Sequence, residues 1–402
     1  MRVLALTTIF PNPFQPNRGP YTRHQLANMH SEHEVRVISP ISWTNETRAL
    51  RAGKPALPAN RRVEVDGIVV DHPRYYYPPK IGHRWHGRFY EWSVKRTFLR
   101  AVEEFSPDVV FSPWPYPDGW AALRLARRAG LPVVVKCIGS DVLQLDKHPS
   151  RRQRTIEAVC GADGVIAVSR HMAVRLIELG VSPERLHVVI DGVDRTRFCP
   201  GDKGAARARL GLSADKRIVL FVGNLVEVKA VDVLLKAWRG VSPGGDVSKL
   251  IIVGDGPLRP ELERQAESME LRPSVEFRGA IPHENLPDWF RAADAFVLAS
   301  RSEGVPNVLL EASACDTPWV ATNVGGIPEI ADLGRSKLVS PDQVDELSDA
   351  LRDILMSPPV GSPAEPRTWE QSAKSLAEFL KAVSKTSRTA ELSTERTTEA
   401  VC

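Results

Sequence analysis

Two glutamates, Glu303 and Glu311, flank a short turn in a pattern that suits the recognition of hydroxyl groups. A carboxylate can accept two hydrogen bonds from a vicinal diol, whereas it repels the oxygens of a phosphate. The apolar run at residues 295–298 predicts a buried parallel strand ahead of the turn. Gly304 allows a tight turn, and Pro306 favours a helix that begins at its own position. The pattern therefore predicts a strand, a sharp loop and a helix, with a carboxylate on each side of the helix start.

The start of this helix is also a predicted anion site. The first N–H groups of a helix have no partner inside it and bind anions at its positive end. Here they are expected to come from Val305, Asn307 and Val308. A diphosphate with a sugar on each side would satisfy these groups and both carboxylates, so the segment predicts a nucleotide-sugar site. The alternative is an ordinary strand-to-helix junction with two solvated glutamates.

The full pattern Glu-Gly-x-Pro-x-x-x-x-Glu, at residues 303–311, resembles the donor-site signature of the family 4 glycosyltransferases. These are retaining enzymes with the GT-B architecture. The resemblance implies an α/β fold of two Rossmann-like domains that face a central cleft, with a final helix crossing back to the first domain. It also implies transfer of a hexose-type sugar from a UDP- or GDP-sugar. Glu311 would bind the ribose hydroxyls and Glu303 the hydroxyls of the transferred sugar.

The length of 402 residues suits two domains of ordinary size. Apolar strands alternate with amphipathic helices along the chain, which predicts parallel sheets covered on both faces. We expect an acceptor domain at residues 1–200, a linker at 201–215 and a donor domain at 216–367. A helix at residues 368–384 would cross back to the acceptor domain. The polar tail at residues 385–402 is predicted to be disordered.

A second group of donor-site residues follows the predicted strand at residues 217–222. Gly223 would turn the chain, and Asn224 and Lys229 would stand near the next helix start, an arrangement typical of diphosphate sites. Family members often carry Arg where Asn224 stands, so Lys229 is expected to supply the main cationic contact. With Glu303, these two residues are the predicted catalytic group. Because the sequence contains no Asp-x-Asp, we expect neither a metal nor another cofactor.

One glycine turn weighs against a different class of enzyme. Gly254-Asp255-Gly256 follows a predicted strand, but Arg259 occupies the place of the third glycine of a dinucleotide-binding fingerprint. A nicotinamide-dependent oxidoreductase is therefore not favoured. The next predicted strand, at residues 275–277, leads into Arg278 and Ile281, which are expected to cover the nucleotide base through backbone contacts.

The acceptor side is expected at strand ends in the first half of the chain. Gly19 precedes a predicted helix, and Gly139 and Asp141 follow a predicted strand at residues 133–137. By resemblance this region contacts the acceptor or the transferred sugar, with the helix N-cap as an alternative role for Asp141. Ile138 stands where relatives carry a sugar-contacting His. A non-catalytic nucleotide-sugar-binding protein of GT-B shape therefore remains an alternative.

Charge is unevenly distributed along the chain. Lys and Arg outnumber Asp and Glu by 29 to 19 in residues 1–200, whereas the acidic residues lead by 30 to 24 in residues 201–402. Residues 72–100 combine basic residues with a single acid, Glu91, and with a series of aromatic residues: Tyr75, Tyr76, Tyr77, Trp85, Phe89, Tyr90 and Trp92. Such a surface suits an anionic membrane, whereas no nucleic-acid recognition motif accompanies it. The alternative is that these aromatics belong to the core.

The remaining composition points to the cytoplasm. No apolar run approaches the roughly 20 residues of a membrane span, and the five cysteines show no paired spacing. We therefore expect a cytoplasmic protein, peripheral at the inner face of the membrane, that acts in polysaccharide biosynthesis on a glycan or lipid-linked acceptor. A soluble small-molecule acceptor is the alternative.

Overall fold

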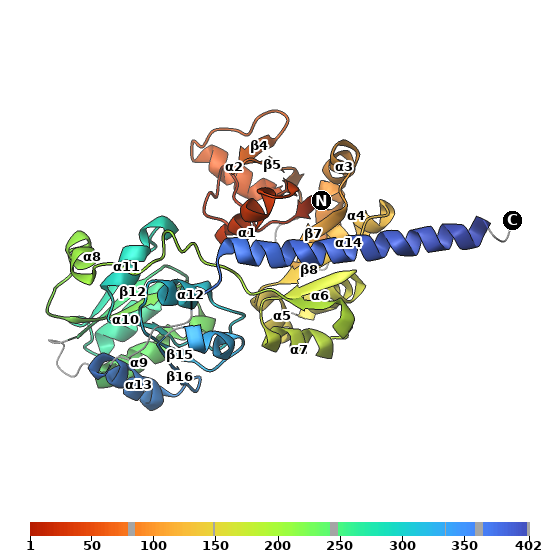
Figure 1. The fold of residues 1–402 in the computed structure, drawn as a ribbon. Helices are drawn as coiled ribbons and strands as arrows, with labels where there is room; N and C mark the ends of the chain where they lie inside the picture. Colours follow the sequence, from red (N-terminus) through yellow and green to blue (C-terminus); the bar gives the residue numbers. More distant parts are fainter. Residues whose placement is uncertain (79–84, 148, 242–247, 334, 358–364, 400–402) are drawn as a thin grey trace. The chain divides into compact units, whose positions relative to one another are not determined.

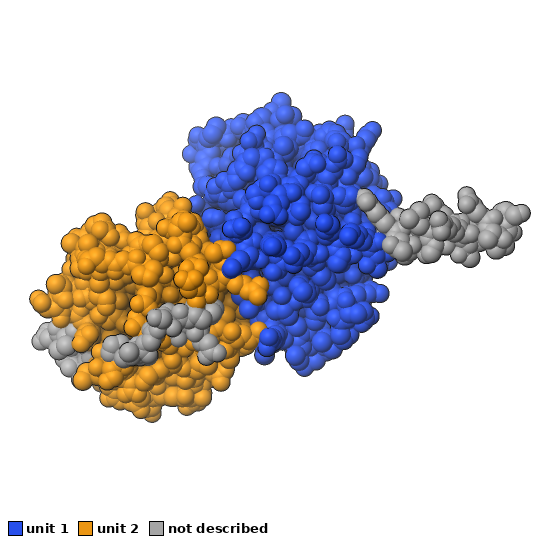
Figure 2. Space-filling model, in the orientation of Figure 1, with its two compact units in different colours: residues 1–191, 369–402 blue, residues 192–368 orange. Residues whose placement is uncertain are grey.

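The computed structural model describes residues 1–78, 85–147, 149–241, 248–333, 335–357 and 365–399. Its contacts divide the chain into two compact units, coloured separately in Figure 2. The first unit comprises Met1–Asp191 and Trp369–Cys402, and the second comprises Gly192–Thr368. Among the helices of the described residues, none is both long enough and apolar enough to cross a membrane.

The first unit is built on an eight-stranded sheet with the order β10-β9-β8-β7-β1-β2-β5-β4. All neighbouring strands are parallel except β4 and β5, which form an antiparallel hairpin. The strands are β1 Arg2–Leu6, β2 Glu34–Ile38, β4 Arg62–Val65, β5 Ile68–Asp71, β7 Val109–Ser112, β8 Val133–Cys137, β9 Gly164–Ala167 and β10 Leu186–Val188. A separate short pair joins β3 Ile41–Ser42 to β6 Arg74–Tyr75.

Helices cover both faces of this sheet because alternate strand residues point to opposite sides. Leu4 and Leu6 of β1 belong to one buried cluster, whereas Val3 and Ala5 belong to the other. The helices of this unit are α1 Pro20–His30, α2 Trp43–Arg51, α3 His86–Phe105, α4 Trp120–Arg128, α5 Ser140–Leu143, α6 Pro149–Gly161, α7 Arg170–Glu178 and α14 Trp369–Glu399 (Figure 1).

The final helix, α14, packs against α1 and buries Leu376 and Leu380 in the core of the first unit. The resemblance therefore placed the crossing helix correctly. The helix continues to Glu399, however, so the tail expected to be disordered from residue 385 is helical in the structure. Residues 385–399 contain neither glycine nor proline, so nothing in the backbone chemistry stops the helix at residue 384.

A buried polar network fastens α14 to the sheet. Lys136 of β8 donates hydrogen bonds to Gln25 Oε1 at 2.8 Å and to Asp191 Oδ1 at 2.6 Å. Gln25 in turn donates to Ser372 of α14, whose hydroxyl donates to the carbonyl of Ile190, both at 3.0 Å. The charge of Lys136 is thus paired in the interior, as a buried ammonium requires. Sequence reasoning had not singled out this lysine.

The second unit contains a six-stranded, wholly parallel sheet with the order β13-β12-β11-β14-β15-β16. Its strands are β11 Arg217–Val222, β12 Ser248–Val253, β13 Val275–Gly279, β14 Ala295–Leu298, β15 Trp319–Thr322 and β16 Ser336–Val339. Its helices are α8 Lys203–Leu210, α9 Val231–Val241, α10 Arg259–Ser268, α11 Pro287–Ala292, α12 Asn307–Ala314 and α13 Val344–Met356. The strand order reverses between β11 and β14, and sheets of this type bind ligands at the carboxyl ends of strands at such a point.

The predicted linker at residues 201–215 is instead part of the second unit and contains α8. Arg207 of this helix is buried and donates to the carbonyl of Ala292 at 3.0 Å and to Asp294 at 2.7 Å. These bonds attach α8 to the rest of the unit. The polar composition of residues 201–215 suggested a linker. Because Arg207 is paired, the segment is instead held against the rest of the second unit.

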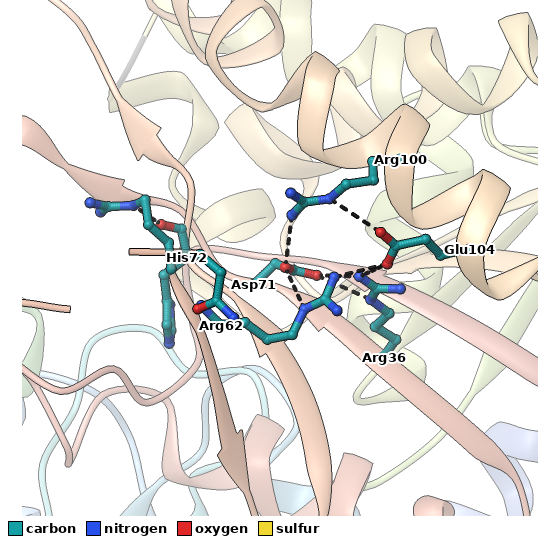
Figure 3. A network of polar contacts seen from close by, with 8 residues as sticks. Arg36, Arg62, Asp71, His72, Arg100 and Glu104 are labelled. Atoms are coloured by element: carbon teal, nitrogen blue, oxygen red, sulfur yellow. Dashed lines mark hydrogen bonds and ion pairs between the residues drawn. The ribbon is translucent and has the colours of Figure 1, made fainter. Parts of the chain in front are cut away.

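An ion-pair network fixes α3 to the edge of the first sheet (Figure 3). Asp71, at the end of β5, accepts hydrogen bonds from Arg36, Arg62 and Arg100. Glu104 of α3 accepts from Arg36 at 2.8 Å and from Arg62 at 2.9 Å. The side chains of Arg36 and Asp71 are only 7% and 2% exposed, so the network holds strands β2, β4 and β5 and helix α3 in one arrangement.

The Asp71→Asn variant is expected to lower the free energy of unfolding by about 3 kcal/mol, because the buried Arg36 loses the more buried of its two charged partners and keeps only Glu104. Asp66→Asn provides a matched control at the tip of the same hairpin, where Asp66 pairs with Arg23 and both side chains are about a third exposed. That change should cost less than about 1 kcal/mol. Urea unfolding of both variants makes the comparison, and equal effects would contradict the structural role of Asp71.

Candidate active site

The candidate site in the second unit lies at the carboxyl ends of β11 and β14. These strands pair in parallel, with Val219 opposite Ala295 and Leu220 opposite Phe296. The turn that follows β11 and the loop at residues 299–306 that follows β14 therefore emerge side by side. The sequence had indicated both segments separately, and the sheet brings them to the point where its strand order reverses.

Lys229 and Glu303 form an ion pair at this point. The Lys229 ammonium donates to Glu303 Oε1 at 2.6 Å, and the Ser300 hydroxyl donates to the same oxygen at 2.6 Å. The two charged side chains are 20% and 12% exposed. Lys229 lies in a short 3₁₀ turn, Glu227–Lys229, just ahead of α9, not at the start of α9 itself. The structure thus joins the predicted diphosphate cation to the predicted sugar-binding carboxylate.

Arg301 ties these two segments together. Its backbone N–H donates to the carbonyl of Val228 at 2.8 Å, and its side chain donates to the carbonyl of Glu227 at 2.7 Å. The guanidinium also bonds Asp342 at 2.8 Å and Asp232 at 3.1 Å. Arg301 therefore positions the turn that carries Lys229 against the loop that carries Glu303. Sequence reasoning missed this role, because nothing local distinguishes Arg301 from a solvated loop arginine.

A pair of glycines after β15 holds the other side of the Glu303 loop. Gly326 N–H donates to the carbonyl of Gly304 at 2.8 Å. Gly325 has φ +58°, and a Cβ there would lie 1.8 Å from the carbonyl oxygen of Glu303. The close approach of the two backbones is possible only with glycine.

The Gly325→Ala variant should therefore displace the Glu303 loop and reduce kcat/KM for sugar transfer by about 100-fold, since shifts of about 1 Å at a reacting centre have effects of this size. Gly211→Ala is the matched control. Gly211 has φ +65°, but no atom lies within 4 Å of a Cβ placed there. Gly211→Ala should lower the free energy of unfolding by only about 1–2 kcal/mol, the effect of a side chain at a positive φ. If both variants turned over donor equally well, the close contact between Gly325 and the Glu303 loop would have no functional role.

The helix start at the centre of the site differs slightly from expectation. Helix α12 begins at Asn307, and Pro306 is its N-cap with φ −75° and ψ 117°, so the predicted start at Pro306 is wrong by one residue. The N–H groups of Asn307 and Val308 belong to the first turn, which has no partner inside the helix. The side chain of Val305 is buried. These N–H groups provide the positive end of α12, which the Glu303 loop leads into.

Glu311 lies one turn into α12 and is 2% exposed. Its Oε1 accepts a hydrogen bond from His283 Nε2 at 2.7 Å, whereas no donor in the described part of the chain reaches its Oε2. The Asn307 Oδ1 is likewise buried without a donor among the described residues. Buried polar atoms are normally satisfied, so this end of α12 offers two acceptors to an incoming hydroxyl or amide. His283 had not been predicted; its only sequence signal is its place two residues after Ile281.

Most of the other residues predicted on the donor side have only their backbone groups available for a ligand. Arg278 is at the penultimate position of β13, and its guanidinium pairs with Glu276 at 2.5 Å and lies over the Trp289 ring at 5.4 Å. Its side chain is thus occupied, and only its backbone and that of Ile281 remain for a base. Asn224 is exposed beyond Gly223. A Cβ on Gly254 would lie 1.9 Å from the carbonyl oxygen of Gly223, which explains why the Gly-Asp-Gly turn needs glycine.

The predicted acceptor-side residues lie in the first unit. Gly19 is the N-cap of α1 with φ +59°, and a Cβ there would lie 2.5 Å from the carbonyl oxygen of Ile9. Asp141 is buried and accepts hydrogen bonds from the N–H groups of Ile138 and Gly139, at 3.0 and 2.6 Å. Burial raises the pKa of Asp141 to about 6, although these N–H groups oppose the shift. The N-cap of α5 is Gly139, so the N-cap role considered for Asp141 is wrong; its carboxylate braces the preceding loop.

Another buried carboxylate in the first unit, Asp118, escaped sequence reasoning. It accepts hydrogen bonds from the backbone N–H of Thr8 at 2.6 Å and from the Thr8 hydroxyl at 2.9 Å. Burial raises the pKa of Asp118 to about 6. The bonds join the segment after β7 to the end of β1, where the strand order of this sheet reverses. In the described residues of both units, no group of three or more His, Cys, Asp and Glu side chains is arranged to hold a metal ion.

Two family descriptions match the chain. "Glycosyl transferases group 1" matches residues 216–357, and "Glycosyl transferase 4-like domain" matches residues 19–192. Among related proteins, a glycosyltransferase assigned to teichuronic acid biosynthesis, TuaC of Bacillus subtilis (strain 168), is 27% identical over 87% of this chain and 88% of its own. D-inositol 3-phosphate glycosyltransferase 1 of Catenulispora acidiphila is 30% identical over 77% of each chain. D-inositol 3-phosphate glycosyltransferase of Frankia alni is 34% identical over 65% of this chain and 69% of its own.

Solved structures agree in fold. Sucrose-phosphate synthase from Thermosynechococcus elongatus superimposes with a TM-score of 0.71 at 21% identity, over the whole of both chains. Anabaena Alr3699/HepE, solved in complex with UDP-glucose, gives a TM-score of 0.68 at 19% identity, covering 98% of this chain and 100% of that one. WaaG, a glycosyltransferase involved in lipopolysaccharide biosynthesis, gives 0.65 at 18% identity, covering 96% and 98%.

Proposed function

The chain belongs to the group 1 glycosyl transferases, the family 4 enzymes of the GT-B fold, and on that premise we propose that it transfers a sugar from a nucleotide-sugar to an acceptor hydroxyl with retention of anomeric configuration. The observation that carries this proposal is the pairing of Lys229 with Glu303 in the loop that leads into α12. Glu311 lies one turn further along the same helix. A cation, two carboxylates and the first N–H groups of a helix are thus carried by the turn after β11 and by the loop and helix that follow β14.

Each group has a defined role in this proposal. Glu311 accepts hydrogen bonds from the ribose hydroxyls, and Glu303 accepts from hydroxyls of the transferred sugar. Lys229 and the first N–H groups of α12 face the diphosphate, and Asn224 adds an uncharged donor. When the bond between the sugar C1 and the phosphate oxygen breaks, negative charge grows on the leaving nucleoside diphosphate. A fixed cation and oriented N–H groups stabilise that charge without reorganisation.

The acceptor completes the reaction on the same face of the sugar. Its hydroxyl oxygen forms the new bond to C1 as the bond to phosphate breaks, and its proton passes to an oxygen of the leaving diphosphate. Protein groups alone neutralise the leaving group in this scheme, since the sequence carries no Asp-x-Asp for a divalent metal. No other cofactor is needed.

We propose a UDP- or GDP-sugar as donor and a cell-surface glycan precursor as acceptor. Support for uridine comes from the structural neighbour solved with UDP-glucose. Support for a cell-surface product comes from the relative assigned to teichuronic acid biosynthesis. A thermal-shift screen against UDP-, GDP- and ADP-sugars identifies the nucleotide, and release of the nucleoside diphosphate from the bound donor then tests turnover. Binding without any release would favour the non-catalytic alternative.

We also propose that the enzyme works as a peripheral protein at the inner face of the membrane. Lys95 and Arg96 are exposed on α3, and each basic residue near an anionic bilayer contributes about 1 kcal/mol. Lys80 and Arg84, two further basic residues of the segment 72–100, lie outside the described residues. Co-sedimentation with anionic vesicles at low salt should fall when Lys95 and Arg96 are both changed to Glu, and should fall in high salt. A wild-type protein that stays in the supernatant would favour a soluble acceptor.

A further inference from the structure

Two hollows with different linings adjoin in the first unit. One, of about 390 Å³, has several polar side chains in its lining, those of Thr8, Asn12, Arg18, Ser42, Asn45 and His86 among them, beside apolar ones such as Ile41 and Pro117. The other, of about 610 Å³, is lined mainly by aromatic rings, those of Trp43, Tyr76, Trp85, Phe89 and Trp92. Tyr77 lines both. We call them the polar hollow and the aromatic hollow.

The polar hollow suits a hydroxylated, anionic group. It opens where β1 and β3 end, and its Thr8 is fixed by Asp118. Arg18 donates to the carbonyl of Thr8 at 2.5 Å and to Gln15 Oε1 at 3.1 Å, which holds its guanidinium at the hollow. Among the described residues that line either hollow, none is an aspartate or a glutamate. The charged side chains in the two linings, Arg18 and Arg88, are therefore positive.

The aromatic hollow suits an apolar chain. Trp92 is 70% exposed, Tyr76 43% and Trp85 42%, although each has a large apolar surface. Arg88 lies over the Trp85 ring at 4.8 Å and adds a cation at its rim. The sequence had left open whether the aromatics of residues 72–100 are core or surface. The structure divides them, since Tyr75 and Tyr90 are buried whereas these three are not.

Tyr77 lies where the two hollows adjoin. The indole N–H of Trp43 donates to the Tyr77 carbonyl at 2.9 Å, and the Tyr77 hydroxyl lies 3.2 Å from Thr44 Oγ1. Its ring stacks on Tyr75 at 5.1 Å. The residue is thus held from several sides. A molecule that fills both hollows must be polar and anionic at one end and apolar at the other.

We propose that the two hollows form the acceptor site and that the acceptor is an anionic amphiphile, a sugar carried on a lipid phosphate. This inference rests on the proposed function. The sugar and phosphate occupy the polar hollow with Arg18, and the first part of the lipid chain lies on the rings of the aromatic hollow. The shared wall at Tyr77 and the cations at the two hollows, Arg18 and Arg88, select this occupant over a soluble neutral acceptor or a neutral lipid.

Farnesyl phosphate is the probe, used below its micellar concentration and followed by calorimetry. Wild-type protein should bind it much more tightly than either inorganic phosphate or farnesol, because each of these fills only one hollow. The double variant Trp85→Ala, Trp92→Ala should bind farnesyl phosphate at least about tenfold more weakly, since two rings lose their contact with the chain. Leu99→Ala is the matched control, because Leu99 is 43% exposed on the same helix but lines neither hollow; its affinity should equal that of wild type.

Two results would overturn the proposal. One is wild-type binding of farnesyl phosphate no tighter than that of inorganic phosphate. The other is a double variant that binds the probe as well as the Leu99→Ala control does. Thermal melting of each variant verifies that it is folded at the temperature of the titration. Binding of UDP and GDP to the wild-type protein is measured separately and tests the donor site, so failure of the acceptor inference and failure of the proposed function are distinguishable.

Discussion

The Glu311→Ala variant is expected to lose nucleotide affinity by about 10- to 150-fold, because the ribose diol loses a charged acceptor worth about 1.5–3 kcal/mol. The structure adds to this expectation. Glu311 is almost wholly buried, and one of its oxygens has no donor within the described residues. A hydrogen bond from a ligand hydroxyl to this buried oxygen contributes more binding free energy than a hydrogen bond to a solvated carboxylate. Calorimetric titration with UDP and GDP measures the loss.

Two further variants make this test specific. Glu311→Gln keeps the shape of the side chain and removes its charge. Because it leaves no cavity, unlike Glu311→Ala, it separates the loss of charge from misfolding around a buried cavity. Glu284→Ala removes an exposed carboxylate next to His283 in sequence and should leave nucleotide affinity unchanged. Glu311→Ala and Glu311→Gln proteins that fold and bind nucleotide like wild type would remove Glu311 from the donor site.

The Lys229→Ala variant is expected to lower kcat by about 100- to 1,000-fold, the usual effect of removing one group that stabilises developing charge. The effect on KM should be smaller, because the interaction is strongest when the diphosphate departs. In the structure the ammonium is held by Glu303 at 2.6 Å, so it is already positioned at the site before substrate arrives. Steady-state kinetics with the donor identified in the thermal-shift screen separate the two effects.

A control and a metal test accompany this prediction. Lys236→Ala removes an exposed lysine of α9 and should leave kcat unchanged. The wild-type enzyme should keep its activity after treatment with EDTA, since Lys229 and the start of α12 are proposed to carry the leaving-group charge. Activity that disappears with EDTA and returns with manganese would assign that charge to a bound metal instead.

The sequence by itself determined the local features of the proposed donor site. The strand at residues 295–298, the turn at Gly304 and the helix behind it depend on hydrophobic pattern and on glycine and proline chemistry, which act over a few residues. The structure reproduces that strand and places the helix start within one residue of its predicted position. The fold class could be predicted for the same reason, because the hydrophobic pattern of the chain shows the alternation of strands and helices.

Only the tertiary structure decided which of these residues meet. Lys229 and Glu303 are far apart in sequence, and their ion pair exists because β11 and β14 are neighbours in the sheet. The bonds of His283 to Glu311 and of Arg207 to Asp294 likewise depend on packing between separate elements. The aromatic residues of α3 were divided into core and surface by the way that helix packs on its sheet. Local propensity cannot encode such contacts, because their free energy depends on partners supplied from elsewhere in the chain.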